Sequence, residues 1–351
     1  MRGNEALAQG AIDAGCRYFF GYPITPQNEI PEYMARHLPE AGGVFLQAES
    51  ELAAINMVYG AAAAGKRVMT TSSSPGISLM QEGISYMAGA ELPAVIANVV
   101  RGGPGLGNIA ASQSDYFQAV KGGGHGDYRT LVLAPFSVQE MYEDTRLAFD
   151  FADRYLTPVV VLADAVLGQM MEPMVFPADV VDPDRLPEKP WATTGRHDGQ
   201  RRIINSLYIV PEELEKTNLR IHRRYQEAQR EVRQTWEGAQ EAEILLVAYG
   251  TAARVCQTVL RLAEEKGIKA ALLRPITLFP FPEKAIAEAA ERVKAILVVE
   301  LSLGQMVEDV QRVAGGRAPV HFYGRPAGVV PTPEEVFAAV EKIHDSSGRR
   351  S

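Results

Sequence analysis

Residues 44–71 read VFLQAESELAAINMVYGAAAAGKRVMTT, and this stretch decides the fold class. A short apolar run at 44–47 precedes an alanine-rich helical segment, and a second apolar run follows at 67–71. A strand, a helix and a further strand in this order form a crossover unit, in which the two strands run parallel in one sheet. The stretch therefore predicts an α/β domain.

Further apolar runs continue this alternation through the first 165 residues, at 17–22, 94–100, 130–134 and 157–163. Because these runs are short and almost continuously apolar, their strands are expected to be buried on both faces, as in a mostly parallel sheet covered by helices. In such a sheet the ligand site lies at the carboxyl ends of the strands.

The rest of the chain has a different composition in each of its parts. Residues 172–200 are rich in Pro and Asp, which indicates a linker or a strap over another surface, and a charged helix is expected from 211 to about 237. A second α/β unit is expected next, with strands at 244–249, 270–273 and 295–300 and helices at 253–266, 283–294 and from 333 onward. The predicted parts are a first domain (1–170), a linker or strap with the charged helix (171–240), a second domain (241–345) and a polar tail (346–351).

The composition is that of a soluble globular protein, with 46% hydrophobic and 22% charged residues among 351. A net charge of −8 without any Lys/Arg block argues against nucleic-acid binding. No apolar run approaches the roughly 20 residues of a membrane span, and no apolar signal core is present, so we expect a cytoplasmic protein without a membrane partner. Cys16 and Cys256 lie outside any CxxC motif, so this chain alone is expected to bind no metal ion or iron–sulfur cluster.

Three strand-end loops carry the candidate site residues. In the first, GYPITP at 21–26, two prolines fix an extended turn that leaves the Thr25 hydroxyl at the mouth of the cleft. An alternative is that Thr25 only caps a helix that begins at Pro26.

The second loop delivers Glu49 and Glu51 into an apolar helix. Carboxylates in a first helical turn are ordinarily surface residues that the helix dipole favours. The small residues that follow, Ala53, Ala54 and 60–64, imply close packing, which would place the Glu51 carboxyl in a cleft of low dielectric where its neutral, donating form is favoured.

The third loop, VVRGGPGLGN at 99–108, has one arginine followed by four glycines. It is a poor dinucleotide fingerprint, because it contains Pro104 and no helical pattern follows directly. Arg101 at a buried strand end suits the two-pronged capture of a small carboxylate, and the alternative is that it bridges loop carbonyls.

Two further segments are polar and rich in small residues. TSSSPG at 71–76 follows a strand and resembles a rim over a ligand, but it lacks the GxSxG pattern of serine hydrolases. KGGGHGDY at 121–128 places His125 in a glycine run without a visible carboxylate partner, so His125 is a minor candidate only.

With these residues in place, the first 170 residues resemble the alpha subunit of the 2-oxoacid:ferredoxin oxidoreductases, most closely the branched-chain type that uses 3-methyl-2-oxobutanoate (2-ketoisovalerate). The resemblance continues through GGGHGDY at 122–128 and GQMMEP at 168–173. Its main motifs are GNEA at 3–6, GYPITPQNEIPEYM at 21–34, QAESELAAINMVYGA at 47–61, SSSPGISLMQEGISYMAGAELP at 72–93 and VRGGPGLG at 100–107.

The resemblance implies a thiamin-pyrimidine-binding domain, in which a glutamate contacts N1′ of the aminopyrimidine ring of thiamin diphosphate. In relatives this carboxylate stands nine residues before a helix glycine, and Glu51 has that spacing to Gly60, so Glu51 is the implied catalytic residue ahead of Glu49. The resemblance also implies that Thr25 and Arg101 face the 2-oxo acid. It implies that the cofactor-binding residues are Glu51, Pro23, Thr25 and Ser73.

The same resemblance implies that this chain forms only half of an active site. The second domain looks like the transketolase C-terminal domain, which usually serves assembly. The GDG(x)nN motif that binds diphosphate and Mg²⁺ is missing here, as are ferredoxin-like cysteines. The implied partners are therefore a beta subunit with the diphosphate and Mg²⁺ site, and ferredoxin-like and gamma subunits with [4Fe-4S] clusters. The implied reaction converts a 2-oxo acid and coenzyme A into acyl-CoA and CO₂, with ferredoxin as electron acceptor.

Several alternatives stay open at this point. The substrate can be 2-oxoglutarate, pyruvate or an aryl glyoxylate instead of a branched-chain acid, and the chain can be a non-catalytic scaffold subunit of such a complex. A single-chain thiamin enzyme would carry the diphosphate motif itself, and a nicotinamide dehydrogenase would carry a dinucleotide fingerprint with its acidic partner. The sequence has neither.

Overall fold

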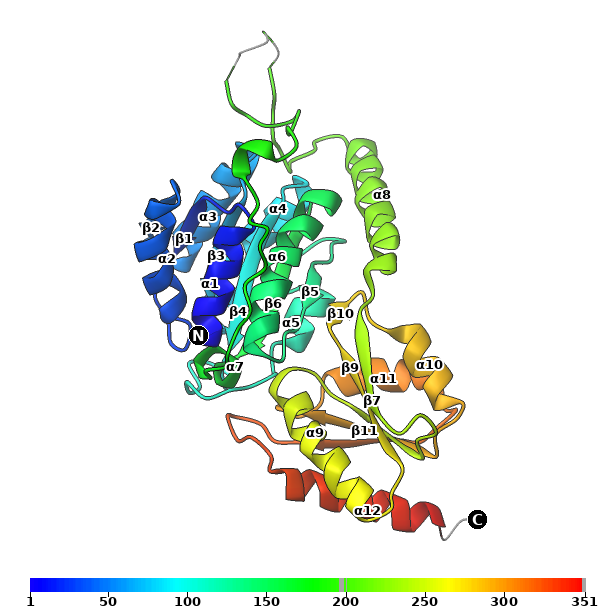
Figure 1. The fold of residues 1–351 in the computed structure, drawn as a ribbon. Helices are drawn as coiled ribbons and strands as arrows, with labels where there is room; N and C mark the ends of the chain where they lie inside the picture. Colours follow the sequence, from blue (N-terminus) through cyan, green and yellow to red (C-terminus); the bar gives the residue numbers. More distant parts are fainter. Residues whose placement is uncertain (196–198, 200, 349–351) are drawn as a thin grey trace.

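The structure is a computed structural model that describes residues 1–195, 199 and 201–348. Two α/β domains lie one beside the other, and the long helix α8 (Pro211–Ala228) runs along one side of the molecule (Figure 1). The α/β fold class and the mostly parallel first sheet that the sequence predicts are confirmed.

The first sheet contains seven strands in the order β10-β5-β6-β4-β3-β1-β2. Every neighbouring pair is parallel except β10 with β5. β4 pairs with β6 over its whole length, from Ala94 opposite Pro158 to Val100 opposite Asp164. The strands are β1 (Tyr18–Gly21), β2 (Val44–Gln47), β3 (Val68–Ser72), β4 (Ala94–Val100), β5 (Leu131–Leu133), β6 (Pro158–Asp164) and β10 (Thr277–Phe279).

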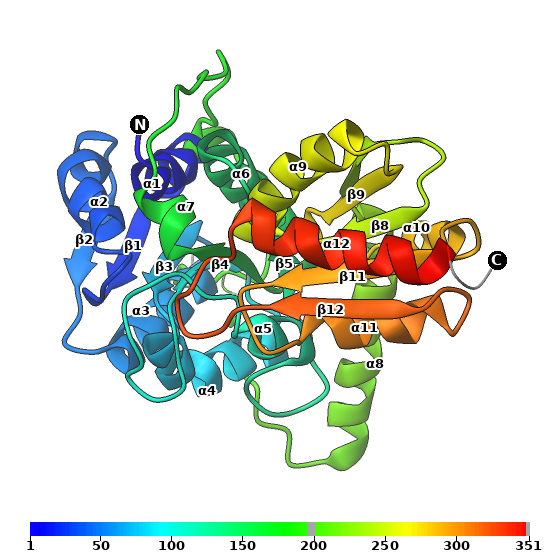
Figure 2. The ribbon, with the colours of Figure 1, turned by 90° about the horizontal axis from the view of Figure 1, so that it is seen from below.

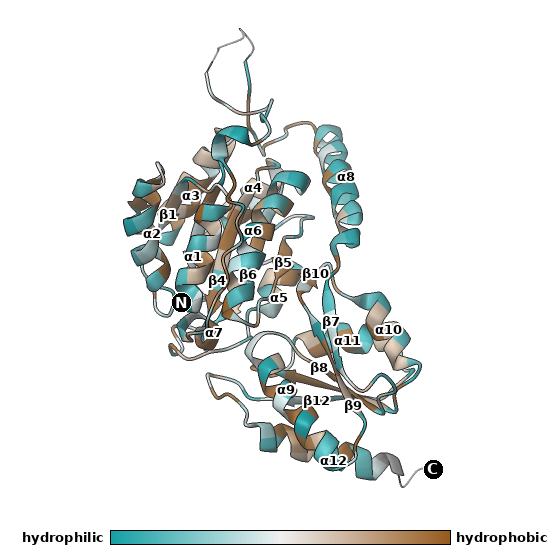
Figure 3. Cartoon of the chain, viewed as in Figure 1, coloured by the Kyte–Doolittle hydropathy of each residue, from teal (hydrophilic) through white to brown (hydrophobic). Residues whose placement is uncertain are grey.

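Helices cover both faces of this sheet, so β3, β4, β5 and β6 are buried at every residue. Side chains alternate between the two faces: Val95 packs with α1 (Gly3–Asp13), α2 (Glu29–Glu40) and α6 (Val138–Tyr155), whereas Ile96 packs with α3 (Glu51–Ala63) and α4 (Pro75–Gly89). The strands are accordingly apolar along their length, while the outer faces of the helices are hydrophilic (Figure 3).

The second sheet has the order β12-β11-β8-β9-β7, with β7 antiparallel to β9 and the other pairs parallel. The sequence analysis missed β7, β12 and α11. The elements are β7 (Gln234–Gly238), β8 (Ile244–Val247), β9 (Ala270–Pro275), β11 (Ala295–Glu300), β12 (Val320–Gly324), α9 (Gly250–Glu265), α10 (Glu283–Ala290), α11 (Met306–Ala314) and α12 (Pro333–Gly348). Since α12 continues to Gly348, the expected polar tail begins inside a helix, and its last residues, 349–351, lie outside the described residues.

The two domains are joined by consecutive strands and share a core. β9 belongs to the second sheet and β10 to the first, although only Ile276 separates them in the chain. The carbonyl of Ile276 accepts a hydrogen bond from the Ala134 N–H at 2.8 Å, at the end of β5. Val132 and Val160 of the first sheet pack in one buried cluster with residues of β8, β9 and β11. The two sheets are therefore connected through adjacent strands and a common buried core.

Residues 170–195 form an extended strap that runs along α1 and α6 (Figure 1). Further along the chain, α8 leads back to the second domain. The strap is held by backbone hydrogen bonds, from Val181 to Asp13 at 2.8 Å and from Thr193 to Ala63 at 2.9 Å. The prediction of one charged helix from 211 to about 237 is wrong beyond Ala228, where a 3-10 turn leads into β7. β7 is an edge strand that is partly exposed to solvent, so its sequence lacks a continuous apolar run.

Candidate functional site

Four segments of the first domain meet at the carboxyl edge of its sheet. They are residues 22–28 after β1 (the Thr25 loop), residues 73–74 after β3, residues 101–110 after β4 and the first turn of α3. Figure 2 views the molecule from this side, where the loop after β4 lies beside the segment that connects β12 to α12. Parallel strands deliver polar residues to one edge, which is where ligands bind in sheets of this kind.

Glu51 is the first residue of α3 and is only 5% exposed. Ser50 caps the helix, because its Oγ accepts a hydrogen bond from the Ala53 N–H at 3.2 Å, and the cap leaves the Glu51 carboxylate available. Ser72 Oγ donates to Glu51 Oε1 over a long distance, 3.4 Å, and in the described part of the chain this is the carboxylate's one hydrogen bond. Glu51 is thus a buried acid with acceptor capacity to spare.

Gly76 makes room for the Glu51 carboxylate. A Cβ atom at position 76 would lie 2.0 Å from Ser72 Oγ and 2.4 Å from Glu51 Oε1, so a side chain here would displace both groups. Gly76 lies in the first turn of α4, directly after β3. Glu49, in contrast, is exposed, so of the two glutamates only Glu51 is enclosed by the protein.

Ser74 ties the loop after β3 to the loop after β4. Its Oγ accepts from the Arg101 N–H at 3.1 Å and donates to the Arg101 carbonyl at 3.3 Å. Its own N–H donates to Asn98 Oδ1 at 3.1 Å, and its φ of 24° lies where L residues rarely occur. The neighbouring Ser73 is fully buried, and its hydroxyl has no hydrogen-bond partner among the described residues.

Arg101 is 8% exposed and bridges two loops through its guanidinium. Nη1 donates to the Thr25 carbonyl at 2.9 Å and Nη2 to the Leu106 carbonyl at 3.1 Å. Nε is buried and has no partner among the described residues. The guanidinium therefore fixes loop carbonyls, as the structural alternative expects, and it also retains an unsatisfied buried donor, which a carboxylate ligand would satisfy.

Thr25 and Pro23 are exposed at the mouth of this edge. Thr25 Oγ1 accepts a hydrogen bond from Asn28 Nδ2 at 3.4 Å. Since α2 begins at Glu29 and not at Pro26, the alternative that Thr25 caps a helix beginning at Pro26 is wrong. A turn closed by the hydrogen bond from the Gln27 N–H to the Ile24 carbonyl intervenes instead.

A second polar layer lies beneath these residues. Asn98, inside β4 near its carboxyl end, donates from Nδ2 to Asp115 Oδ2 at 2.9 Å. Burial raises the pKa of the Asp115 carboxyl, while the hydrogen bonds from Asn98 and Ser74 act in the opposite direction. Asn98 therefore connects a buried acid to the loop that Ser74 anchors.

His125 does not join the site. Its carbonyl accepts from Ser85 Oγ at 2.5 Å, and its exposed ring lies edge-on to Tyr86, with 6.1 Å between the ring centroids. Ser85 lies ten residues beyond the start of α4, about 15 Å along the helix from the turn that faces Glu51.

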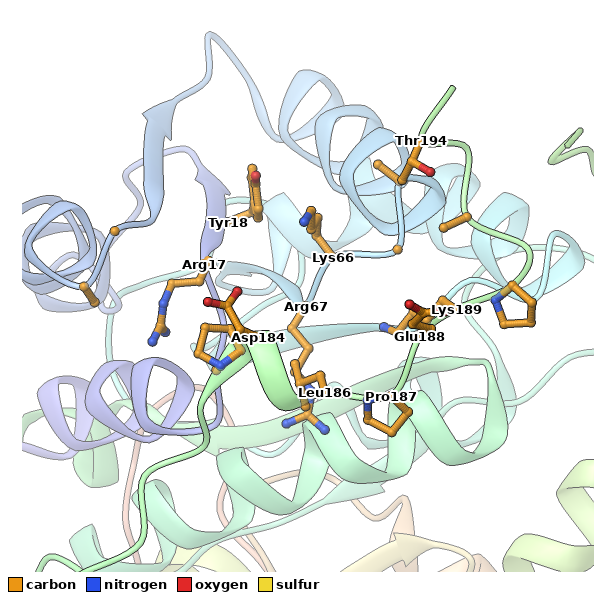
Figure 4. Close-up of a pocket in the computed structure, with 18 of the residues that line it drawn as sticks. Arg17, Tyr18, Lys66, Arg67, Asp184, Leu186, Pro187, Glu188, Lys189 and Thr194 are labelled. Carbon is orange, nitrogen blue, oxygen red and sulfur yellow. The ribbon is translucent and has the colours of Figure 1, made fainter. Parts of the chain in front are cut away.

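A cavity of about 750 Å³ lies at the opposite edge of the sheet, between the strap and the amino ends of β1 and β3 (Figure 4). Arg17 and Arg67 line it, but their guanidiniums donate to carbonyls at the carboxyl end of α1, which carries partial negative charge. Arg67 also pairs with Asp150 and Asp153 at 2.8 Å each. These cations have structural partners, and none of the sequence-predicted site residues lines the cavity.

Both cysteines are buried, and burial raises the pKa of the Cys16 thiol to about 12 and raises that of Cys256 as well. Within residues 1–195, 199 and 201–348, no group of three or more His, Cys, Asp and Glu side chains is arranged to hold a metal ion. No helix in the same residues is long and apolar enough to cross a membrane.

The structure thus places Thr25, Arg101 and Glu51 at one edge of the sheet. Arg101 binds the Thr25 carbonyl and Ser74, and Ser72 binds Glu51. His125 and Glu49 do not belong to this group. The sequence analysis missed the residues that support them, chiefly Asn98 and Gly76. Gly76 had a signal, because a glycine shortly after a strand, in the TSSSPG segment, indicates that another group approaches closely. Asn98 had none, since it stands inside an otherwise apolar strand.

Comparison with known proteins identifies the family to which the chain belongs. The model of the pyruvate flavodoxin/ferredoxin oxidoreductase family, thiamine diphosphate-binding, matches residues 9–243, and the model of pyruvate:ferredoxin oxidoreductase core domain II matches residues 242–336. Ketoisovalerate oxidoreductase subunit VorB of Methanothermobacter thermautotrophicus is 50% identical over 352 residues, with 100% of this chain and 98% of that protein covered. 2-Oxoglutarate synthase subunit KorA of Archaeoglobus fulgidus is 41% identical, with 92% and 94% covered.

Two solved structures extend the comparison. A 2-oxoglutarate:ferredoxin oxidoreductase from Magnetococcus marinus, with 2-oxoglutarate, coenzyme A and succinyl-CoA bound, has a TM-score of 0.84 and 26% identity, and this chain spans 64% of that longer chain. An inactive split-gene transketolase has a TM-score of 0.63 at 15% identity, so it shares the fold alone. Two family models thus account for both domains in order, and relatives match along nearly their whole length. The chain belongs to the pyruvate flavodoxin/ferredoxin oxidoreductase family.

Proposed function

We propose that this chain is the alpha subunit of a thiamin-diphosphate-dependent 2-oxoacid:ferredoxin oxidoreductase that acts on branched-chain 2-oxo acids. The observation that carries the proposal is the Glu51 carboxylate, buried at the start of α3 with one long hydrogen bond. The reaction is the oxidative decarboxylation of a 2-oxo acid with coenzyme A, which yields acyl-CoA, CO₂ and reduced ferredoxin. The 50% identity to a ketoisovalerate oxidoreductase subunit supports the branched-chain class.

The residues fit one half of a thiamin site. Glu51 is a buried acid that this chain leaves largely unpaired, and Ser73 Oγ and Arg101 Nε are buried polar atoms without partners in the described residues. Native proteins rarely leave such groups unsatisfied unless a ligand or water completes them. When bound, thiamin diphosphate supplies the nucleophile for the 2-oxo carbon and the sink for the electrons that decarboxylation leaves behind.

Glu51 is the proposed catalytic residue. Its carboxyl holds a proton at N1′ of the aminopyrimidine ring, and it passes that proton on and takes it back during the reaction. Its enclosure by Gly76 and Ser72 keeps the carboxyl in one place and limits access of water. A group fixed in this way transfers a proton without first having to reorient.

Thr25 and Arg101 are the proposed substrate contacts, and Pro23, Thr25 and Ser73 are the further proposed cofactor contacts. The Thr25 hydroxyl is exposed at the mouth, where it can donate to the carbonyl region of the 2-oxo acid. Arg101 binds the carboxylate with donors that the loop carbonyls leave free. Ser73 has to become accessible for its contact, because it is fully buried in this structure.

The chain works in a heteromeric complex. Large apolar side chains are exposed on the segments around the site: Leu52 on α3, Leu79 on α4 and Leu106 in the loop after β4, by 47, 56 and 80%. Exposed large apolar side chains on several segments of one site are typical of a surface that another chain covers. We assign this cover to a beta subunit that brings the diphosphate and Mg²⁺ site, and we assign the [4Fe-4S] clusters to ferredoxin-like and gamma subunits.

The test uses the complex purified with all its chains. Viologen reduction is measured with coenzyme A and a panel of 2-oxo acids: 3-methyl-2-oxobutanoate, 2-oxoglutarate, pyruvate and phenylglyoxylate. We expect the highest kcat/KM with the branched-chain acid. Glu51→Gln should lower kcat by about a hundredfold or more while thiamin diphosphate still binds, because an amide keeps the shape and loses the proton.

Glu49→Gln is the matched control, since it makes the same change two residues away at an exposed position. It should be much milder. A complex that keeps full turnover with Glu51→Gln would instead support a scaffold subunit. A higher kcat/KM for 2-oxoglutarate than for 3-methyl-2-oxobutanoate would refute the substrate class and leave the role of Glu51 intact.

A further inference from the structure

Two sequence motifs that the proposed chemistry leaves unexplained, GNEA at 3–6 and GQMMEP at 168–173, come together in the structure. The start of α1 lies beside α7 (Ala165–Gln169), as Figures 1 and 2 both show. The Gly3 N–H donates to the Met170 carbonyl at 3.1 Å, and Arg2 forms an isolated bridge with Met171. The two ends of the first domain thus meet directly beneath the Thr25 loop.

Each motif presents one amide side chain to the same two acceptors. Asn4 Nδ2 donates to the Pro26 carbonyl at 2.9 Å and to Glu29 Oε2 at 2.7 Å. Gln169 Nε2 donates to the same carbonyl at 3.1 Å and to the same carboxylate oxygen at 2.8 Å. The pair therefore fixes the end of the Thr25 loop and the first residue of α2 from two sides.

The glycines of the two motifs make this convergence possible. A Cβ atom at Gly3 would lie 1.9 Å from the Leu167 carbonyl oxygen, and a Cβ atom at Gly168 would lie 2.5 Å from Asn4 Oδ1. Contacts this short do not occur with real side chains, so both positions require glycine for α1 and α7 to approach. Asn4 itself is fully buried, so its hydrogen bonds are shielded from water.

The rest of the Thr25 loop is fixed by other residues. Gln27, fully buried, donates to the Tyr22 carbonyl at 3.2 Å and accepts from Thr71 Oγ1 at 2.5 Å. Arg101 donates to the Thr25 carbonyl. Asn4 and Gln169 bind the Pro26 carbonyl, directly after Thr25. Without them this carbonyl would have no hydrogen-bond partner among the described residues.

We propose that Asn4 and Gln169 form an amide clamp that positions the Thr25 loop for its substrate. They are positioning residues, because they act through Pro26 and Glu29 and do not reach the reacting atoms. This inference rests on the proposed function of Thr25. Its structural part, the fixing of the loop, is independent of that function and can be measured separately.

The test compares three variants of the complete complex. Asn4→Asp and Gln169→Glu keep nearly the same shape, remove the amide donors and place a carboxylate against Glu29. Gln9→Glu is the matched control, because Gln9 lies on the same helix and donates to another carboxylate, Asp13 Oδ1, at 2.7 Å without touching the Thr25 loop. Gln169 is exposed, so its variant is expected to fold even if Asn4→Asp does not.

Two readouts decide the proposal. Amide hydrogen exchange of the peptide that covers residues 22–28 should accelerate roughly tenfold or more in both clamp variants, and KM for the 2-oxo acid should rise by a similar factor. Gln9→Glu should change neither, even if it lowers the melting temperature as much. Exchange and KM should both recover toward low pH, where a protonated carboxyl donates to Glu29 again.

Unchanged exchange in both clamp variants would overturn the proposal, and so would faster exchange with KM and kcat unchanged. Thr25→Val separates this inference from the one on which it rests. If Thr25→Val has no kinetic effect, the proposed substrate contact has failed, and the exchange rates alone then decide whether the clamp holds the loop.

Discussion

At the scale of single residues, the site combines the Glu51 carboxylate, which has few hydrogen-bond partners, with the Arg101 guanidinium, which has two. Glu51 has one long hydrogen bond, whereas Arg101 binds the carbonyls of Thr25 and Leu106 and keeps a buried Nε free. Each observation has a consequence that a single substitution can measure. For Arg101 the question is whether its main role is to bind a substrate through its free Nε donor or to hold the two loops through its Nη donors.

Arg101→Lys should raise KM or lower kcat/KM for the 2-oxo acid by about tenfold or more, because an ammonium replaces a planar, two-pronged donor with a point charge. The melting temperature of the complex should change little, because Lys still reaches one carbonyl. The check is a pair of measurements on one preparation, steady-state kinetics and thermal unfolding. Unchanged kinetics with a clear drop in melting temperature would leave Arg101 as a brace between loops.

The sequence analysis named the candidate residues at this edge of the sheet but not the residues that hold them in place. Glu51, Thr25 and Arg101 stand at strand ends next to prolines or small residues, and that pattern is local in the chain. Asn4 and Gln169 lie 165 positions apart, and their common targets become visible only when α1 and α7 are side by side. A pairing between distant segments leaves no periodicity or spacing for sequence reasoning to use.

At the scale of elements, the predicted strands of both domains are present, because each is an apolar run in the sequence, and all of them except β1 and β2 are buried at every residue. The strands that the sequence analysis missed differ from these predicted strands. β10 has three residues and β12 is partly exposed along its length, so neither displays the apolar run of a buried strand. Edge strands depend on their neighbours for pairing, and this information is absent from their own sequence.

Helix α6 carries a buried acid that makes stability depend on pH. Burial raises the pKa of Asp144 well above its usual value, the neighbouring Glu140 adds to this effect, and Arg274 opposes it. The Asp144 contribution to stability is therefore present below the pKa of the unfolded chain and is lost as the pH rises through the raised pKa of the folded protein. Its Oδ2 is buried without a partner among the described residues.

Asp144→Asn should consequently stabilise the complex at high pH, because it removes the cost of ionising a buried group. The difference in melting temperature from the wild type should grow between about pH 5 and pH 9. Asp150→Asn is the control on the same helix, at an exposed position that pairs with Arg67. A constant difference across this range, for Asp144→Asn as for the control, would contradict the prediction.

At the scale of the whole molecule, the segments that form the proposed site carry exposed leucines, Leu52, Leu79 and Leu106. The isolated chain should bind thiamin diphosphate only weakly, because in the proposed site Glu51 and its neighbours would contact the pyrimidine side alone, and the sequence has no diphosphate motif. Titration calorimetry of the purified chain, without and with its beta subunit, checks this. Micromolar binding by the chain alone would contradict a site shared between subunits.

The chain passes from the second sheet at β9 to the first sheet at β10, and this connection affects how the protein folds during its synthesis. The first sheet uses residues 18–164 and then a last strand at Thr277–Phe279, so it remains incomplete until the ribosome has synthesised the first part of the second domain, through β9. Until then β5 is an open edge, and the apolar surface around Val132 is uncovered. The nascent chain therefore passes through a period in which a chaperone or early closure of the second domain protects it from aggregation.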